Sequence, residues 1–414
     1  MARGLRRAFL LVAVSAAVLI PARAALAFTD VPTSYWDYTA IKYVATTNTW
    51  MQDYGTTTFK PTTHEIREYL ARTLVEVYAP TEPIDPSIHF PDLPDSDPFY
   101  RYANVVTKLG WMPKYQSGNW APGALIQRTG FDKAMVLALG LTDEVNGLAN
   151  IHRDDGAKYT VSTDFPYLLL ARTLELHFNH TTESMDLEPS DYMTRDEAAY
   201  SLWFAKTQLS WELTTAAMFK DISLPTLTPT DPLQHSKLLV TQYALNQVGY
   251  PYIWGGEWHS VSPSGYCCGY QPKGGFDCSG FAWWVLKKNE SGYNAAQFRS
   301  YSGWSLPQRT SSTMAQSTGT HYTYANLRIG DLMFFASNGG NTWQDVDHVG
   351  MYIGNDWMID STGSENGPTI DFVAPGTWWN DHFVWGRRLI NGGPSDSKPQ
   401  GHVTKRSLLG GDAK

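Results

Sequence analysis

Cysteine is scarce in this chain: its 414 residues include three, Cys267, Cys268 and Cys278. So few thiols exclude a protein held together by a disulfide framework. No histidine or second cysteine pair stands at metal-ligand spacing from the vicinal pair, so we expect no metal and no other cofactor. An odd number leaves at least one thiol unpaired. If Cys267 and Cys268 are bonded, the free thiol is Cys278, and a lone thiol calls for a chemical role.

Charged residues are also few, at 17% of the chain, and acidic side chains outnumber basic ones by 40 to 32. The formal net charge of −8 has the wrong sign for binding a phosphate backbone, so we expect no nucleic-acid partner. Aromatic residues are frequent by contrast, at 14%. Most aromatic side chains fill cores, and the remainder favour a flat, uncharged ligand such as a sugar or a peptide.

Long apolar runs are missing after residue 27. Before it, a basic start with three arginines leads into an apolar stretch over 8–20 and ends in Ala-Leu-Ala before Phe28. This pattern is typical of a cleaved secretory signal peptide over residues 1–27. A helix that spans a bilayer needs about 20 apolar residues, and this stretch stops at Pro21, although a retained anchor is the alternative. We therefore expect a secreted mature chain without a membrane span.

The first half of the chain contains an internal repeat. The segment 28–32, Phe-Thr-Asp-Val-Pro, recurs at 90–94 as Phe-Pro-Asp-Leu-Pro. Each copy is followed by an aromatic pair, a helical pattern, a loop ending in an aromatic residue and Pro, and an arginine that opens the next helix. A weaker third copy leads into Thr-Arg-Asp-Glu at 194–197. The three arginines at these helix starts are Arg67, Arg128 and Arg195.

The repeat resembles the surface-layer homology (SLH) domain, whose copies begin F-x-D-V-P and carry a T-R-A-E signature. This resemblance implies three SLH-like repeats, over 28–88, 89–145 and 146–212. It also implies an all-α bundle with pseudo-threefold symmetry, whose grooves bind an anionic secondary cell-wall polysaccharide. Only the third copy keeps the Thr-Arg-x-Glu part of the signature, so we expect only one or two of the grooves to bind the polymer.

By the same resemblance, the arginines at the three helix starts contact the wall polymer. A guanidinium beside free helix N–H groups suits a carboxylate or phosphate ligand. The alternative is that each arginine only fixes its helix against a neighbouring loop through local ion pairs.

Two segments lack the patterns of a folded core. Residues 213–235 are rich in Pro, Thr and Asp, which predicts a semi-rigid linker. The tail over 393–414 is rich in Gly, Ser, Pro and Lys, and we expect it to be disordered.

The second half contains the elements of a nucleophilic site. Cys278 precedes a stretch of helical spacing, so it stands at or near a helix N-terminus, where the dipole favours the thiolate. His348 opens an alternating stretch that turns at 354–356, and Asp360 follows on the returning stretch. A β-hairpin makes His348 and Asp360 direct or diagonal neighbours. Cysteine, histidine and carboxylate then correspond to the nucleophile, base and orienting group of acyl-transfer enzymes.

Each of these three residues also has a simpler interpretation when taken alone. Cys278 fits a buried structural thiol, His348 a packed core histidine, and Asp360 a turn or capping residue. The flanking motifs favour the catalytic interpretation of the three together.

Five ordered motifs resemble the NlpC-type cysteine peptidase family over residues 236–392. They are P-Y-x-W-G-G, F-D-C-S-G-F, G-D-L, D-H-V-G-M-Y-I-G and a closing G-R-R. The resemblance implies an α+β papain-like domain, and hence a multidomain chain. It implies that Cys278 is the nucleophile, His348 the base and Asp360 the third catalytic residue, a place that is usually His. The residues that it implies for substrate binding are Tyr252, Trp254, Asp277 and Ser279.

Together the two resemblances predict a secreted peptidoglycan hydrolase associated with the cell wall or surface layer. Its expected reaction is that of a cysteine endopeptidase cleaving the amide between the γ-carboxyl of D-glutamate and a diamino acid in stem peptides. One alternative is an amidase or acyl transferase that uses the same triad on another wall amide. Another is a non-catalytic surface-layer protein that binds the wall. The polar insertion over 257–275 leaves the preferred length of the stem peptide open.

Overall fold

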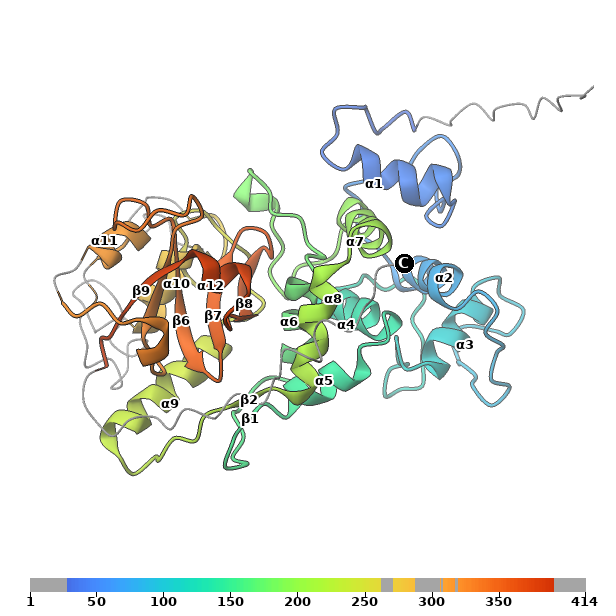
Figure 1. Ribbon diagram of the computed structural model, residues 1–414. Coiled ribbons are helices and arrows are strands. Elements are labelled where there is room, and N and C mark those ends of the chain that lie inside the picture. The colour runs from blue at the N-terminus through green and yellow to red at the C-terminus, as the bar shows by residue number, and fades with distance from the viewer. Residues whose placement is uncertain (1–27, 262–270, 287–305, 307, 317–318, 391–414) are drawn as a thin grey trace, which may run out of the picture.

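The computed structural model describes residues 28–261, 271–286, 306, 308–316 and 319–390. Three predictions lie outside the described residues: the signal peptide over 1–27, the state of Cys267 and Cys268, and the tail over 393–414. Helices dominate the N-terminal half and a sheet dominates the C-terminal half (Figure 1). Among the helices described, none combines the length and the apolar character needed to cross a bilayer.

Three helices of the N-terminal half begin at the three predicted arginines: α2 (Arg67–Tyr78), α4 (Arg128–Ala138) and α7 (Arg195–Thr207). Each has a shorter helical segment before it in the chain: α1 (Tyr38–Lys42) with η1 (Tyr43–Thr47), α3 (Tyr100–Lys108) and α6 (Phe165–Thr173). Helix α2 packs against α3, α4 against α6, and α7 against α1. The first two pairs thus each join two successive copies of the predicted repeat, and the third pair joins the last copy to the first.

The segments just before α2, α4 and α7 are joined in a closed ring of backbone hydrogen bonds. The N–H of Glu65 donates to Met193 O at 2.8 Å, that of Met193 to Ile126 O at 2.8 Å, and that of Ile126 to Glu65 O at 3.1 Å. Each segment therefore bonds to both of the others. This ring gives the three helix starts a pseudo-threefold arrangement.

The same segments satisfy the first N–H group of each helix. Arg195 N–H donates to Thr63 O at 3.0 Å, and Arg128 N–H to Asp191 O at 2.8 Å, with the equivalent bond at the start of α2. A helix N-terminus attracts anions only through N–H groups that lack a partner. These first N–H groups are therefore not free for a ligand, which corrects the expectation of open helix N-termini.

The predicted linker over 213–235 is wrong in part, because much of it is folded. It holds elements that follow α7 in the chain: most of α8 (Trp211–Ala216), then η3 (Ala217–Asp221), β2 (Ser223–Leu224) and the start of α9 (Pro232–Leu245). Phe219 and Leu224 are buried, and the carboxylate of Asp231 caps α9. Because the segment is rich in Pro and Thr, its apolar residues, which pack against the helical half, did not stand out as a pattern in the sequence.

The smaller elements of the helical half are α5 (Thr142–Ala149), β1 (His152–Arg153) and η2 (Glu183–Met185). Strand β1 pairs with β2 in parallel, and η3 packs against α5. The segment after α7 is therefore part of the helical half up to β2.

The C-terminal half is built on a five-stranded antiparallel sheet of order β8-β7-β6-β5-β9. Its strands are β5 (Leu332–Phe335), β6 (His348–Gly354), β7 (Trp357–Thr362), β8 (Gly367–Phe372) and β9 (Phe383–Arg387). Helix α10 (Cys278–Leu286) packs against β6 and β7. The remaining elements are β3 (Glu257–Trp258), β4 (Gly275–Phe276), α11 (Ser311–Ala315), η4 (Tyr324–Asn326) and α12 (Trp378–His382).

The hairpin predicted around residues 354–356 is present as β6 and β7. Asn355 and Asp356 at its turn have φ values of 52° and 64°, the left-handed pair that matches the twist of a tight hairpin. This turn fixes which residues of the two strands face each other.

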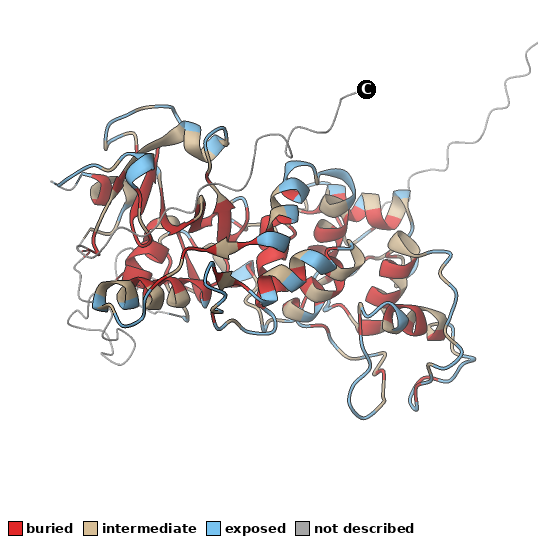
Figure 2. Cartoon of the chain, turned by 60° about the horizontal axis from the view of Figure 1, so that its bottom comes forward, coloured by how far each residue is buried: buried red, intermediate tan, exposed pale blue. Residues whose placement is uncertain are grey.

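The two halves share one apolar core. One cluster of buried residues includes side chains of α2, α4, α6 and α7 and of the sheet, and buried segments, red in Figure 2, occur in both halves. Edge strand β8 packs directly on α6. The Asn366 side chain donates to Phe178 O at 2.7 Å, and the Arg172 guanidinium donates to Gly249 O at 3.1 Å. The helical half thus forms a fixed support for the sheet.

Candidate active site

The three predicted catalytic residues come together at one cleft. Cys278 is the first residue of α10 and a free, partly exposed thiol. His348 begins β6, and its Nε2 lies 2.5 Å from Asp360 Oδ2 on β7. This is the neighbour relation that the hairpin predicted. Cys278 and His348 both line a cleft of about 2360 Å³.

The environment of Asp360 is unusual for a carboxylate. It is completely buried, and burial raises the pKa of Asp360 to about 7, opposed by a hydrogen bond from Asp371. Near pH 7, therefore, the hydrogen bond between Asp360 and His348 depends on which of the two side chains carries the proton. Ser361, the next residue, donates to Phe276 O at 2.8 Å and so ties β7 to the segment that precedes Cys278.

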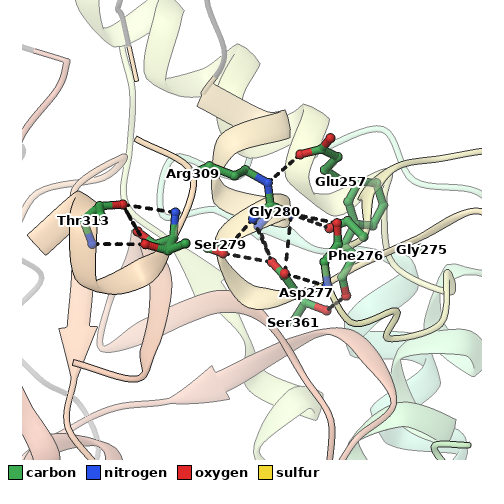
Figure 3. A network of polar contacts seen from close by, with 12 residues as sticks. Glu257, Gly275, Phe276, Asp277, Ser279, Gly280, Arg309, Thr313 and Ser361 are labelled. Carbon is green, nitrogen blue, oxygen red and sulfur yellow. Dashed lines mark hydrogen bonds and ion pairs between the residues drawn. The ribbon is translucent and has the colours of Figure 1, made fainter. Parts of the chain in front are cut away.

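The start of α10 is held by the carboxylate of Asp277 (Figure 3). Asp277 Oδ1 accepts from Gly280 N–H at 2.5 Å, and Oδ2 accepts from Gly255 N–H at 2.9 Å. A side chain at Gly280 would place its Cβ 1.9 Å from Gly256 O. The glycine of the Asp-Cys-Ser-Gly motif is therefore needed for the close approach of this loop to the helix. Capping and approach together fix the position of Cys278.

Arg309 is a residue of the site that the sequence did not reveal. Its guanidinium pairs with Glu257 and Asp277 and donates to Ser279 Oγ at 2.8 Å and to Gly255 O at 3.0 Å (Figure 3). Burial acts to lower the pKa of Arg309, but the Asp277 and Glu257 carboxylates outweigh it and raise the pKa. No motif surrounds Arg309, so no sequence signal pointed to it.

All four residues predicted to bind substrate line the same cleft as Cys278. Trp254 is 79% exposed, and its backbone N–H donates to Glu183 of the helical half at 3.0 Å. Burial, together with charge on Cys278 and Asp277, raises the pKa of Tyr252. The polar atoms of Asp277 and Ser279 are already engaged with Arg309 and the helix start. Substrate binding by these four residues stays a prediction.

The helical half supplies one wall of the cleft. Trp211, Leu213 and Met218, from α8 and η3, line it together with residues of the catalytic half. Trp211 is 53% exposed, and Trp378 of α12, also in the lining, is 52% exposed. The sequence did not point to this wall, because α8 and η3 fall at the end of the third repeat and in the segment expected to be a linker.

Arg195 lies away from the cleft and is completely buried. Its Nη1 donates to Asp53 at 2.7 Å and to Glu65 at 3.1 Å. Its Nε donates to Phe59 O at 2.9 Å, and its Nη2 to Met51 O at 3.0 Å. The guanidinium is thus surrounded by acceptors of the protein itself.

Arg128 is also buried and binds within the protein. Its Nη1 donates to Leu187 O at 2.7 Å and to Gly249 O, in the catalytic half, at 2.6 Å. Its Nε lies 3.3 Å from Asp132, which also contacts His177 at 2.6 Å. Burial acts to raise the pKa of Asp132, but the charges of His177 and Arg128 hold it below its usual value.

Arg67 follows the same pattern, donating to Trp120 O at 2.8 Å and to Pro113 O at 2.9 Å, with its guanidinium over the Trp120 ring. The contacts of all three arginines are those of the local interpretation, in which each fixes its helix against a loop. Contact with a wall polymer stays a prediction that these contacts do not support.

No group of three or more His, Cys, Asp or Glu side chains within the described ranges is arranged to hold a metal ion.

Family models match both halves of the chain. The model described as the NlpC/P60 family matches residues 249–388, and the one described as the S-layer homology domain matches residues 27–64.

Curated relatives match the chain over part of their length. The chain is 28% identical over 154 residues to the murein DD-endopeptidase MepH of Escherichia coli, covering 36% of this chain and 46% of that protein. It is 28% identical over 243 residues to the gamma-D-glutamyl-L-lysine dipeptidyl-peptidase of Bacillus cereus, covering 56% of this chain and 60% of that protein. The chain thus spans about half of the length of these relatives.

Among solved structures, the peptidoglycan hydrolase RipB of Mycobacterium tuberculosis is 27% identical, with 41% of this chain and 75% of that chain covered and a TM-score of 0.28. The family models confirm the NlpC resemblance and, for the first of the three expected repeats, the SLH resemblance, while the second and third repeats stay a prediction. Residues 249–388 form an NlpC/P60 domain, and an S-layer homology domain precedes it at residues 27–64.

Proposed function

We propose that this chain is a secreted, wall-anchored peptidoglycan hydrolase whose C-terminal half is a papain-like cysteine endopeptidase. The observation that carries this proposal is a free thiol at a helix start, on the same cleft as a histidine bound to a buried carboxyl group. The NlpC/P60 match supports it, as do the names of two relatives, a murein DD-endopeptidase and a gamma-D-glutamyl-L-lysine dipeptidyl-peptidase.

The geometry suggests how the reaction runs. Because Nε2 of His348 is occupied by Asp360, Nδ1 is the nitrogen left to take the proton of the Cys278 thiol. The thiolate attacks the amide carbon, and backbone N–H groups at the start of α10 stabilise the oxyanion. The imidazolium then returns its proton to the leaving amine as the C–N bond breaks. Water, activated by the neutral imidazole, cleaves the thioester and restores the thiol.

For the bond, we propose the amide between the γ-carboxyl of D-glutamate and a diamino acid. The Bacillus cereus relative is named for a γ-D-glutamyl-L-lysine bond, which supports this choice. The Escherichia coli relative is named as a DD-endopeptidase, so a different amide of the stem peptide is the second candidate.

For the anchor, we propose that three SLH-like repeats hold the enzyme on an anionic wall polysaccharide. The closed ring of hydrogen bonds and the three helix pairs are the arrangement expected of three such repeats. The buried arginines support this bundle from within, so we place polymer contacts on exposed residues of its grooves. Sedimentation of the mature chain with isolated walls, before and after removal of their secondary polysaccharide, tests the anchor.

The enzymatic proposal is tested by mass spectrometry of defined muropeptides after incubation with the mature protein and with Cys278→Ala. New amino termini on the diamino acid, absent with the variant, are the expected result. Release of a whole stem peptide from the sugar, or transfer of an acyl group, would instead identify an amidase or an acyl transferase. Intact substrates with both proteins, in samples that still sediment with walls, would support the non-catalytic alternative.

A further inference from the structure

A second carboxyl group lies behind the His348–Asp360 pair. Asp371 on β8 stands opposite Met358 of β7, while Asp360 stands opposite Thr369. Asp360 and Asp371 are therefore diagonal neighbours on one face of the sheet. Asp371 is buried and also lines the cleft.

The two carboxyl groups lie close enough for each to affect the pKa of the other, and a hydrogen bond between them requires a proton on one of them. Asp360 Oδ1 and Asp371 Oδ2 are both buried, and no N–H or other O–H group among the described residues donates to either atom. Asp360 Oδ2, by contrast, is taken by His348. A proton between Oδ1 and Asp371 is thus the available way to satisfy both groups.

The surroundings favour that proton on Asp371. Burial and the charge of Asp360 raise the pKa of Asp371 well above its ordinary value, opposed by the Trp379 indole N–H and by His348. Trp379 also packs against the His348 ring, with centroids 5.1 Å apart. Two adjacent carboxylates rarely both ionise in such a site.

The other charged groups that face this pair do not neutralise it. Glu365, in the turn between β7 and β8, is buried, and its burial and the neighbouring carboxyl groups of Asp371 and Asp360 raise the pKa of Glu365, so it supplies no charge that balances the pair. Glu175, after α6, acts on Glu365 in the same sense. Within the described ranges, no Lys or Arg forms an ion pair with Asp360, Glu365 or Asp371. Without a neighbouring cation, the negative charge of this carboxyl pair is reduced by protonation of one of its members.

We propose that Asp371 is a positioning residue, which in its protonated form donates a hydrogen bond to Asp360 Oδ1 and so keeps Asp360 as the carboxylate that accepts the Nε2–H of His348. The consequence concerns the histidine tautomer. If Asp360 itself carried the proton, it would donate to Nε2, and the neutral ring would hold its own proton on Nδ1, the nitrogen that must act as base. The inference rests on the proposed function in assigning His348 as that base.

The test compares Asp371→Asn with Asp371→Leu through the pH dependence of kcat/KM on a stem peptide. Asparagine keeps a donor toward Asp360 Oδ1, so we expect an acid limb near that of the wild type. Leucine removes the donor, so the acid limb should move up by about one pH unit, with about a tenfold loss at pH 6. Asp331→Asn, which alters a buried carboxylate bound to Arg388, is the matched control and should leave the limb in place.

A second readout does not require turnover. The ¹⁵N chemical shifts of His348 should report the Nε2–H tautomer in the wild type and in Asp371→Asn, and a mixture or the Nδ1–H tautomer in Asp371→Leu. An unchanged tautomer and acid limb in a folded Asp371→Leu variant would overturn the role of Asp371. A wild type that cleaves nothing but shows the expected tautomers would contradict the proposed function and leave this inference standing.

Discussion

Buried charge is handled in opposite ways at two places in the molecule, one in each half. At the ring of the helical half, Arg195 is surrounded by Asp53 and Glu65, and Arg128 by Asp132. Behind the cleft of the catalytic half, Asp360 and Asp371 are buried with His348 as the basic group nearest to them. In the first arrangement each buried charge has an oppositely charged partner beside it. In the second, the charge of the two carboxyl groups depends on whether they are protonated.

The two arrangements therefore have different roles, one in the stability of the fold and the other in the proposed reaction. A buried charge with fixed partners contributes to the fold, because removing one partner leaves the other uncompensated. A buried carboxyl group without a cation costs stability and is kept where its proton equilibrium serves a reaction. We therefore expect variants at the ring to change stability and variants behind the cleft to change activity.

Asp360→Asn should give the largest effect. An amide in this place donates to His348 and favours the wrong tautomer, so kcat should fall by about a thousandfold or more, while the melting temperature stays the same or rises. Single-turnover kinetics on a purified muropeptide and a thermal melt measure the two quantities. A variant that loses stability and keeps its activity would place Asp360 with the ring residues and break the comparison.

Arg195→Ala should give the largest change in stability. It leaves Asp53 and Glu65 buried without their cation, so the free energy of unfolding should fall by about 3 to 5 kcal/mol, measured by urea denaturation. Activity per folded molecule should remain that of the wild type. Lys108→Ala, at the exposed pair with Glu82, is the control and should cost less than about 1 kcal/mol. Equal losses in the two variants would show that the ring charges are not compensated as described.

Glu365→Gln should have a smaller effect, visible as a pH dependence. Burial, together with the neighbouring carboxyl groups of Asp371 and Asp360, raises the pKa of Glu365 well above its unfolded value. The folded state therefore holds more protons, and its stability falls as the pH rises from about 4. Glutamine removes that proton, so the free energy of unfolding should fall less steeply, with a gain of about 1 kcal/mol at pH 8. Parallel pH profiles of the two proteins would mean that Glu365 is not held neutral.

Local patterns in the sequence predicted what depends on local structure. The turn at Asn355 and Asp356 fixed the hairpin, and the hairpin brought His348 to Asp360. The helical spacing after Cys278 placed that residue at a helix start. These features follow from backbone geometry over a few residues, and for that reason a sequence without relatives is enough to find them.

What the sequence did not predict depends on contacts between distant segments. A helix that begins with arginine looks the same whether its N–H groups are free or bonded to another repeat, so the ring was not foreseen. Arg309 contacts Asp277, which lies 32 residues earlier in the chain, and Asp371 reaches the site through the register of β8 on β7. The spacing of residues along the sequence does not predict contacts between segments so far apart.

Trp211→Ala should give the smallest effect. It tests whether a residue of the helical half contributes to activity as well as to stability. Trp211 is 53% exposed, so its loss should leave the melting temperature almost unchanged. It lines the cleft opposite the catalytic half, where a long wall fragment has more surface to contact than a short peptide. We expect kcat/KM to fall about fivefold on polymeric peptidoglycan, equivalent to about 1 kcal/mol, and to stay constant on a free stem peptide. An equal loss on both substrates would assign Trp211 to the fold, and no loss on either would confine substrate contact to the catalytic half.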